Sequence, residues 1–282
     1  MSSLIAAARP AMPFAPAPVS LFVPHGAPTF ALRPGAAGAA LAAMADALPR
    51  PRALVVVSAH WDSAQAAVGS ADRHATLHDF HGFPRELYAL NYPATGCPEL
   101  AAHIVRTLHD AGLPAALDAG RGLDHGAWVP LRLMHPDADV PVIPLSLQSR
   151  QGPRGAWRLG RALAPLTAQG VRVIGSGNMT HNLRDWQIVA QGDGQPPAYV
   201  RGFADWMAAR LADGDLDALL DYRQRAPDAA RAHPTEEHLL PFFVALGAAG
   251  DAARAERFHA GIDDYVLAMD AWAFHARQEE KT

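Results

Sequence analysis

The apolar residues of the chain form short β-branched runs that alternate with longer segments rich in alanine, leucine and arginine. Three of these runs are almost continuously apolar, which is typical of strands covered on both faces of a sheet. Because helical segments separate the runs, the pattern predicts a single α/β domain whose central sheet is flanked by helices on both faces. The expected strands are Leu21–Val23, Ala53–Ser58, Val140–Leu147 and Val171–Gly175, and the expected helices are Ala36–Leu48, Pro98–Ala111, Pro153–Ala168, Ala198–Leu211 and Thr235–Leu246.

The amino-terminal residues 1–19 are rich in alanine and proline and have no helical period. Their four prolines interrupt the apolar stretch that a secretory signal requires, so we interpret residues 1–19 as a loose leader and residues 20–282 as the catalytic domain. No apolar run approaches the roughly 18 residues of a transmembrane helix, and we expect a cytoplasmic protein.

Composition narrows the function classes. The formal net charge is −4 and no block of lysine or arginine is present, which argues against nucleic acid or an anionic membrane as a partner. The single cysteine, Cys97, excludes an intramolecular disulfide framework and a cysteine-rich zinc module. The 14 histidines are a surplus, and they direct the search for function.

Three histidines follow predicted strands. His25 comes after the first apolar run, His60 after the second, and His181 after the run VRVIGSGNMT. Ligands of α/β sheets bind at the carboxyl ends of the strands, and imidazole is the commonest neutral metal ligand. Each histidine taken alone is more readily a hydrogen-bonded structural residue. The shared position of the three favours one crevice that binds a metal.

Other histidines lie near predicted helix starts. His125 follows Asp124, which suits a helix N-cap with a solvated histidine beside it. His233 and His238 flank the start of the segment HPTEEHLLPFF, whose carboxylates suit the positive end of a helix dipole. That structural interpretation leaves the two histidines themselves unexplained.

Two further patterns are weak. The segment His74–Cys97 has no clear period and suggests a loop or lid; its histidines at 74, 78 and 81 have helical spacing, but a Gly-Phe-Pro sequence breaks any helix there. The sequence GSGNMT at 175–180 has the first two glycines of a dinucleotide loop but lacks the third and the acidic partner. Serine-hydrolase, zincin and P-loop motifs do not occur.

Six motifs in order resemble one family: VPHGAPTF, VVVSAHW, HDFHGFPRELYALNYPATG, GLDHGAWVPLRLMHPDADVPVIPLSLQ, GSGNMTHNLRDW and HPTEEHLLPFFVALGA. They are similar to the class III extradiol ring-cleavage dioxygenases, in the 4,5-DOPA dioxygenase branch of the LigB-like group. The resemblance covers roughly residues 20 to 275. It implies cleavage of a small aromatic diol, DOPA-like or caffeate-like, by O2.

The resemblance also implies a mononuclear non-haem Fe(II) centre. In the isolated protein, Zn(II) is the alternative metal at this site. His25 and His60 correspond to two metal ligands, and HPTEEH supplies the third, for which we favour His233 over His238. His238 is then the alternative metal ligand or a substrate-binding residue. His181 corresponds to the acid/base histidine and to a fourth ligand when zinc replaces iron. His125 corresponds to a second pocket histidine that contacts substrate or dioxygen.

Two alternatives stay open. A zinc hydrolase could use the same histidines to activate water. A non-enzymatic, Memo-like binding protein would keep the fold without ring cleavage. The sequence is compatible with a homo-oligomer and does not identify the catechol.

Overall fold

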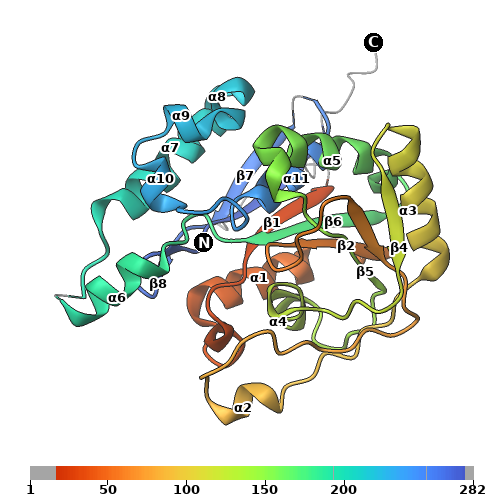
Figure 1. Cartoon of the computed structure of the whole chain (residues 1–282), viewed down its shortest axis with the longest axis horizontal. Helices are drawn as coiled ribbons and strands as arrows, with labels where there is room; N and C mark the ends of the chain where they lie inside the picture. The colour runs from red at the N-terminus through yellow and green to blue at the C-terminus, as the bar shows by residue number, and fades with distance from the viewer. Residues whose placement is uncertain (1–16, 193, 252, 277–282) are drawn as a thin grey trace, which may run out of the picture.

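The computed structural model describes residues 17–192, 194–251 and 253–276. Its centre is a six-stranded mixed sheet in the order β5-β2-β6-β1-β10-β7 (Figure 1). The first four strands in that order are parallel, and the last two are antiparallel to their neighbours. The strands are β1 (Ser20–Pro24), β2 (Ala53–Ser58), β5 (Val142–Pro144), β6 (Val171–Gly177), β7 (Arg254–His259) and β10 (Ala271–His275).

Helices cover both faces of this sheet, as the sequence predicts. Alternate residues of β2 point to opposite sides: Val55 and Val57 join one apolar cluster, and Leu54 and Val56 join the other. Helices α1 (Gly35–Ala47) and α4 (His125–Met134) lie on the second side, below the sheet in Figure 1. Helices α3 (Pro98–Asp110), α5 (Gly152–Thr167) and α11 (Leu240–Ala248) lie on the first side.

The remaining elements are short or lie outside the sheet. Helices α6 (Leu183–Gln191), α7 (Ala198–Asp213), α8 (Leu216–Leu220), α9 (Tyr222–Arg225) and α10 (Ala229–Ala232) extend to one side in Figure 1. Two small sheets pair β3 (Ala66–Gly69) with β4 (Ala115–Asp118) and β8 (Ile262–Asp263) with β9 (Leu267–Ala268). The expected lid contains one short helix, α2 (Arg85–Tyr88), and there are 3₁₀ turns at Pro28–Ala31 and Ser149–Gln151.

The prediction is wrong about the start of the last expected helix. Helix α11 begins at Leu240, and the residues from Pro234 to Leu239 form turns. Pro241 stands in the first turn of the helix, where its missing amide hydrogen costs no helical bond. The five residues placed in the helix by the sequence are therefore a loop, and this loop carries Glu237 and His238.

The parallel strands bring three sequence motifs to one edge of the sheet. Ser58 at the end of β2 pairs with Ser176, and Pro24 at the end of β1 pairs with Gly177. The residues that follow β1, β2 and β6 therefore meet at a common carboxyl edge. Residues 1–16 of the expected leader lie outside the described residues, and no described helix is long and apolar enough to cross a bilayer.

Candidate metal centre

Five histidines gather at the carboxyl edge of the sheet. The rings of His25 and His60 lie 4.9 Å apart between centroids, and the ring of His125 lies 4.1 Å from that of His60. The ring of His238 lies 5.3 Å from His25 and 5.0 Å from His60, and it stacks on His181 at 3.5 Å with an interplanar angle of 6°. The predicted convergence of the histidines after β1, β2 and β6 thus holds in the structure.

The hydrogen bonds of His25 fix where its proton lies. Its Nδ1 is 3.0 Å from the Oγ of Ser176, and that hydroxyl gives its own proton to the carbonyl of Gly126. Because the Ser176 proton is already used, the Nδ1 of His25 must be the donor to Ser176. The Nε2 of neutral His25 therefore carries a lone pair, and it faces the Nε2 of His60 at 3.2 Å.

A distance of 3.2 Å between two nitrogens suits two ligands of one metal ion. Imidazole nitrogens about 2.1 Å from a metal lie roughly 3.0–3.4 Å from each other at octahedral or tetrahedral angles. Burial, together with the neighbouring histidines, lowers the pKa of His25 well below its usual value, and burial first of all lowers that of His60 to about 4. Both rings are therefore neutral at physiological pH, the form that binds metals. The donor set of His25, His60 and His125 could hold a metal ion.

Asp79 supports two of these histidines. Its Oδ1 accepts hydrogen bonds from the backbone amide and the Nδ1 of His125, at 2.8 and 3.0 Å, and its Oδ2 lies 3.8 Å from the Nδ1 of His60. Burial opposes ionisation, but the bonds and charge of His125 prevail and lower the pKa of Asp79 to about 2. The sequence reasoning missed this carboxylate, although it lies between two histidines in HDFHGF.

Asp124 confirms the cap predicted for the helix that follows it. Its Oδ1 accepts from the amide of Ala127 at 3.1 Å, which caps α4, and also from the hydroxyl of Ser58 at 2.6 Å. The same hydroxyl accepts from the amide of His60 at 3.2 Å. One carboxylate therefore joins the end of β2 to the start of α4. His125 is buried beside this cap and is not solvated as that interpretation expected.

Glu237 has the corresponding place behind His238. Its Oε1 accepts from the Nδ1 of His238 at 3.0 Å, which leaves the other nitrogen of that ring free to bind a ligand. Burial lowers the pKa of His238 well below its usual value and lowers that of His181 to about 4. The side chains of His181, Glu237 and His238 form a second group with metal-ligand spacing.

His233 lies apart from this group. Its ring is fully buried and packs against Phe203 and Tyr222, at centroid distances of 5.5 and 6.5 Å. Its Nε2 donates to the carbonyl of Met179 at 2.9 Å. The preference for His233 over His238 as third ligand does not agree with this placement, because His238 is the one whose ring reaches His25 and His60.

The glycines of GSGNMT serve close packing. A Cβ atom on Gly175 would collide with the carbonyl oxygen of Pro241, and one on Gly177 would collide with that of His238. The amide of Asn178 also donates to the carbonyl of His238 at 2.9 Å. Small residues at these two positions therefore let the loop before α11 approach β6 and bring His238 to the group.

Two of the three lid histidines bind the backbone. The Nε2 of His74 lies 2.8 Å from the carbonyl oxygen of Val142, and that of His78 lies 3.0 Å from the carbonyl oxygen of Leu90, so each ring donates to the backbone. His81 is exposed. None of the three belongs to a group of described residues with metal-ligand spacing.

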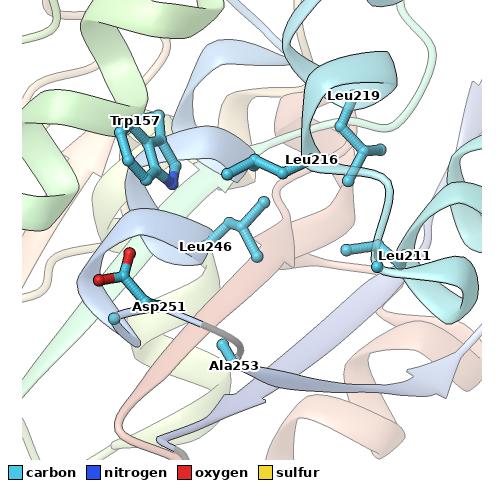
Figure 2. A pocket seen from close by; sticks show the side chains of 9 residues that line it. Trp157, Leu211, Leu216, Leu219, Leu246, Asp251 and Ala253 are labelled. Atoms are coloured by element: carbon cyan, nitrogen blue, oxygen red, sulfur yellow. The ribbon is translucent and has the colours of Figure 1, made fainter.

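Two cavities differ in chemistry. One has a volume of about 510 Å³ and is lined by His181, Arg184, Asp185, Arg231 and Thr235, among others. The other, shown in Figure 2, lies near the carboxyl end of α11; it is mostly apolar, and its one ionisable lining residue, Asp251, pairs with Arg161 at 2.9 Å. Of these two cavities, the one beside His181 adjoins the histidine group.

Known proteins resemble this chain along most of its length. Residues 37–266 match the family model described as the catalytic LigB subunit of aromatic ring-opening dioxygenase. A 4,5-DOPA dioxygenase extradiol of Beta vulgaris is 40% identical over 232 residues, covering 80% of this chain and 83% of the relative. The protein of the same name from Escherichia coli K12 is 37% identical over 233 residues, covering 81% and 84%.

A comparison with solved structures agrees with the sequence similarity. A solved structure of an uncharacterised Escherichia coli K12 protein superposes with a TM-score of 0.73 at 32% identity, covering 90% of this chain and 98% of that one. Sequence similarity, fold and a buried group of histidines with metal-ligand spacing lead to the same conclusion. The chain belongs to the LigB family of class III extradiol ring-cleaving dioxygenases.

Proposed function

We propose that this enzyme opens the ring of a catechol bearing a carboxylate, DOPA-like or caffeate-like, with Fe(II) held by His25, His60 and His238. The observation that carries the proposal is the 3.2 Å separation of the Nε2 atoms of His25 and His60, with the His25 proton held on the far side of its ring by Ser176. Family membership supports the reaction class.

The third ligand follows from the loop before α11. The resemblance implies that this ligand comes from HPTEEH, and of the two histidines in that segment only His238 has its ring within 5.3 Å of both His25 and His60. Three protein ligands leave open coordination positions, as non-haem Fe(II) oxygenases require. When bound there, the iron supplies a Lewis-acid and redox centre that brings together catechol and O2.

His125 keeps a pocket role in this proposal. Its ring lies 4.1 Å from His60, and Asp79 holds it by two hydrogen bonds. With Nδ1 as the donor to Asp79, its Nε2 is available to a substrate or to dioxygen. Because His25, His60 and His125 also have metal-ligand spacing, the choice between His125 and His238 needs a direct test.

His181 is the proposed acid/base group. It stacks on His238 and lines the 510 Å³ cavity, so it lies between the histidine group and the space available to substrate. Burial lowers its pKa to about 4, which keeps the ring neutral and able to accept a catechol proton at pH 7. A nearby catecholate would raise the pKa of His181 and so favour proton acceptance.

The charge of the same cavity supports a carboxylate substrate. Arg231 in its wall is already bound to Asp185, with 2.7 Å between Nε and Oδ2. Arg184 has no carboxylate partner among the residues that the structure describes. An unpaired guanidinium in this wall would bind the carboxylate of DOPA or caffeate and orient the diol toward His181.

The test is anaerobic reconstitution with Fe(II), followed by measurement of oxygen uptake and absorbance after addition of L-DOPA, caffeate, protocatechuate or unsubstituted catechol. We expect a yellow product and one O2 consumed per diol, with better turnover of the carboxylates. The Zn(II)-loaded protein is the matched control and should not consume O2. Iron-loaded protein that consumes no O2 with any of these diols would contradict the proposal.

A further inference from the structure

His233 is a buried polar residue that the proposed chemistry does not use. Its ring is fully buried in a largely aromatic environment, and burial lowers its pKa to about 3, so it is neutral. The carbonyl of Met179 accepts its Nε2 proton, which leaves Nδ1 with a lone pair. No described residue donates to that buried Nδ1. An unsatisfied buried nitrogen costs about 1–3 kcal/mol, so what favours a histidine at this position is the bond that its other nitrogen makes to Met179.

The bond from His233 is one of several that join the segment after β6, which carries His181, to the segment before α11, which carries His238. The amide of His181 donates to the carbonyl of Ala232 at 2.9 Å, and the side-chain amide of Asn182 donates to the carbonyl of Arg231 at 2.7 Å. With the bond from His233 to Met179, three consecutive links join the end of β6 to the chain that leads into HPTEEH.

The two segments meet in the stacked rings of His181 and His238, whose centroids are 3.5 Å apart. His181 is two residues beyond Met179, and His238 is five residues beyond His233. The bond between His233 and Met179 therefore restrains the separation of the segments that carry both rings. Without it, the carbonyl of fully buried Met179 would lose its acceptor bond, and its segment would keep the backbone bonds from Met179 to Ala268 and from His181 to Ala232 but lose the link that His233 makes.

We infer that His233 is a positioning residue for His181: by holding the Met179 carbonyl, it fixes the His181 ring against His238. This inference rests on the proposed role of His181 in proton transfer. Misplacement of an acid/base group by about 1 Å lowers the rate by up to about 10²-fold. The bond between His233 and Met179 therefore has a measurable effect on catalysis, although His233 does not touch the substrate.

Three substitutions separate positioning from packing. His233→Phe keeps the ring and its contacts with Phe203 and Tyr222 but removes the donor. His233→Gln places an amide nitrogen the same number of bonds from the backbone as Nε2 and so restores a donor. Ser20→Ala is the matched control, because it removes a buried hydrogen bond of the same kind, 2.6 Å from Ser20 Oγ to the carbonyl of Ala245, at the opposite end of β1.

We expect His233→Phe to bind iron as the wild type does, with KM little changed and kcat per bound iron lower by about 10–100-fold. His233→Gln should recover most of the loss, and Ser20→Ala should keep the wild-type kcat. Crystal structures should show the His181 ring displaced from His238 in the Phe variant alone. If the Phe variant does not fold, His233→Asn, whose shorter amide cannot reach Met179, is compared with His233→Gln.

Three results would overturn the inference: an unchanged kcat per bound iron, loss of iron binding by His233→Phe, or an undisplaced His181 ring. The crystallographic readout does not depend on turnover. Failure of the wild-type enzyme to consume O2 would contradict the proposed function, whereas a fixed His181 ring in the Phe variant would contradict the positioning role.

Discussion

Replacement of Asp79 by asparagine removes one negative charge behind His60 and His125 and leaves the shape of the side chain intact. The carboxylate accepts two bonds from His125, and the pKa of Asp79 is lowered from 3.8 to about 2, against the effect of burial, by the bonds and charge of that histidine. A lowering of this size corresponds to about 2 kcal/mol of unfolding free energy at neutral pH. Because the asparagine oxygen still accepts one bond, we expect a loss of about 1–2 kcal/mol.

The pH dependence identifies the origin of the loss. A depressed carboxyl pKa stabilises the fold above pH 3.8, and this contribution disappears as the pH falls toward 2. The difference between wild type and Asp79→Asn should therefore be constant between pH 5 and 7 and shrink on acidification. Urea unfolding of the metal-free proteins at several pH values measures it.

Asp139→Asn provides the control for this experiment. Asp139 forms an exposed ion pair with Arg50, in which both side chains are largely accessible to water, so its loss should have little effect on unfolding. Equal stability of Asp79→Asn and wild type at pH 7, or a difference that persists unchanged to pH 2, would refute the electrostatic account of Asp79.

Further predictions concern metal, substrate and pH. His238→Ala should lose more Fe(II) affinity than the roughly 10–100-fold that removal of a supporting hydrogen bond costs, whereas His125→Ala should retain iron and lose turnover. Metal analysis after dialysis distinguishes the two variants, and the opposite result would assign the third ligand to His125. Arg184→Met should raise KM for caffeate by about 10–100-fold and leave unsubstituted catechol unaffected, as steady-state oxygen uptake would show. Because the pKa values of His60 and His181 are lowered to about 4, the unfolded metal-free chain binds more protons than the folded one between pH 4 and 6.5. The free energy of unfolding should therefore decrease on acidification through that range, by about 1.4 kcal/mol per pH unit for each histidine. Denaturant titrations that show no such slope would contradict these values.

The part of the fold that the sequence predicts is the part built from continuous apolar runs. Strand β2 has the predicted bounds, and β1, β5 and β6 overlap the expected strands. The two antiparallel strands at the other side of the sheet were missed. In β7, RAERFH, charged residues interrupt the apolar ones because this edge strand is only partly covered, and β10, AWAFH, is too short to give a clear period.

The candidate site also has a part that the sequence predicts and a part that it does not. The convergence of His25, His60 and His181 follows from their positions after parallel strands, which is a local property of the sequence. Their supporting groups are not local: His25 meets Ser176 across 151 positions, and His125 meets Asp79 across 46. No spacing rule finds such pairs.

The choice between the two histidines of HPTEEH shows the same limit. A position before a predicted helix does not determine the direction of a ring. What separates the two histidines is the distant carbonyl of Met179, which binds the ring of His233, and the close approach to Gly177, which lets His238 reach the group. Both causes lie in β6 and its continuation, more than 50 residues earlier in the chain.

The charges around the site are those that the proposed binding of a deprotonated diol requires. The three proposed ligand rings are neutral, so a bound Fe(II) would add two positive charges to a buried region. Two carboxylates lie directly behind the rings, Asp79 beside His60 and Glu237 beside His238, and together they would balance that charge. The carboxylates contact the outer sides of the rings, so they do not occupy the positions where substrate would bind. Under the proposed function, a catechol entering from the cavity would meet the metal charge on its own side, with neutral His181 available to accept a proton and Arg184 in the same cavity wall. Loss of either carboxylate should make iron binding weaker and more dependent on pH, since the balancing charge would then have to come from solvent.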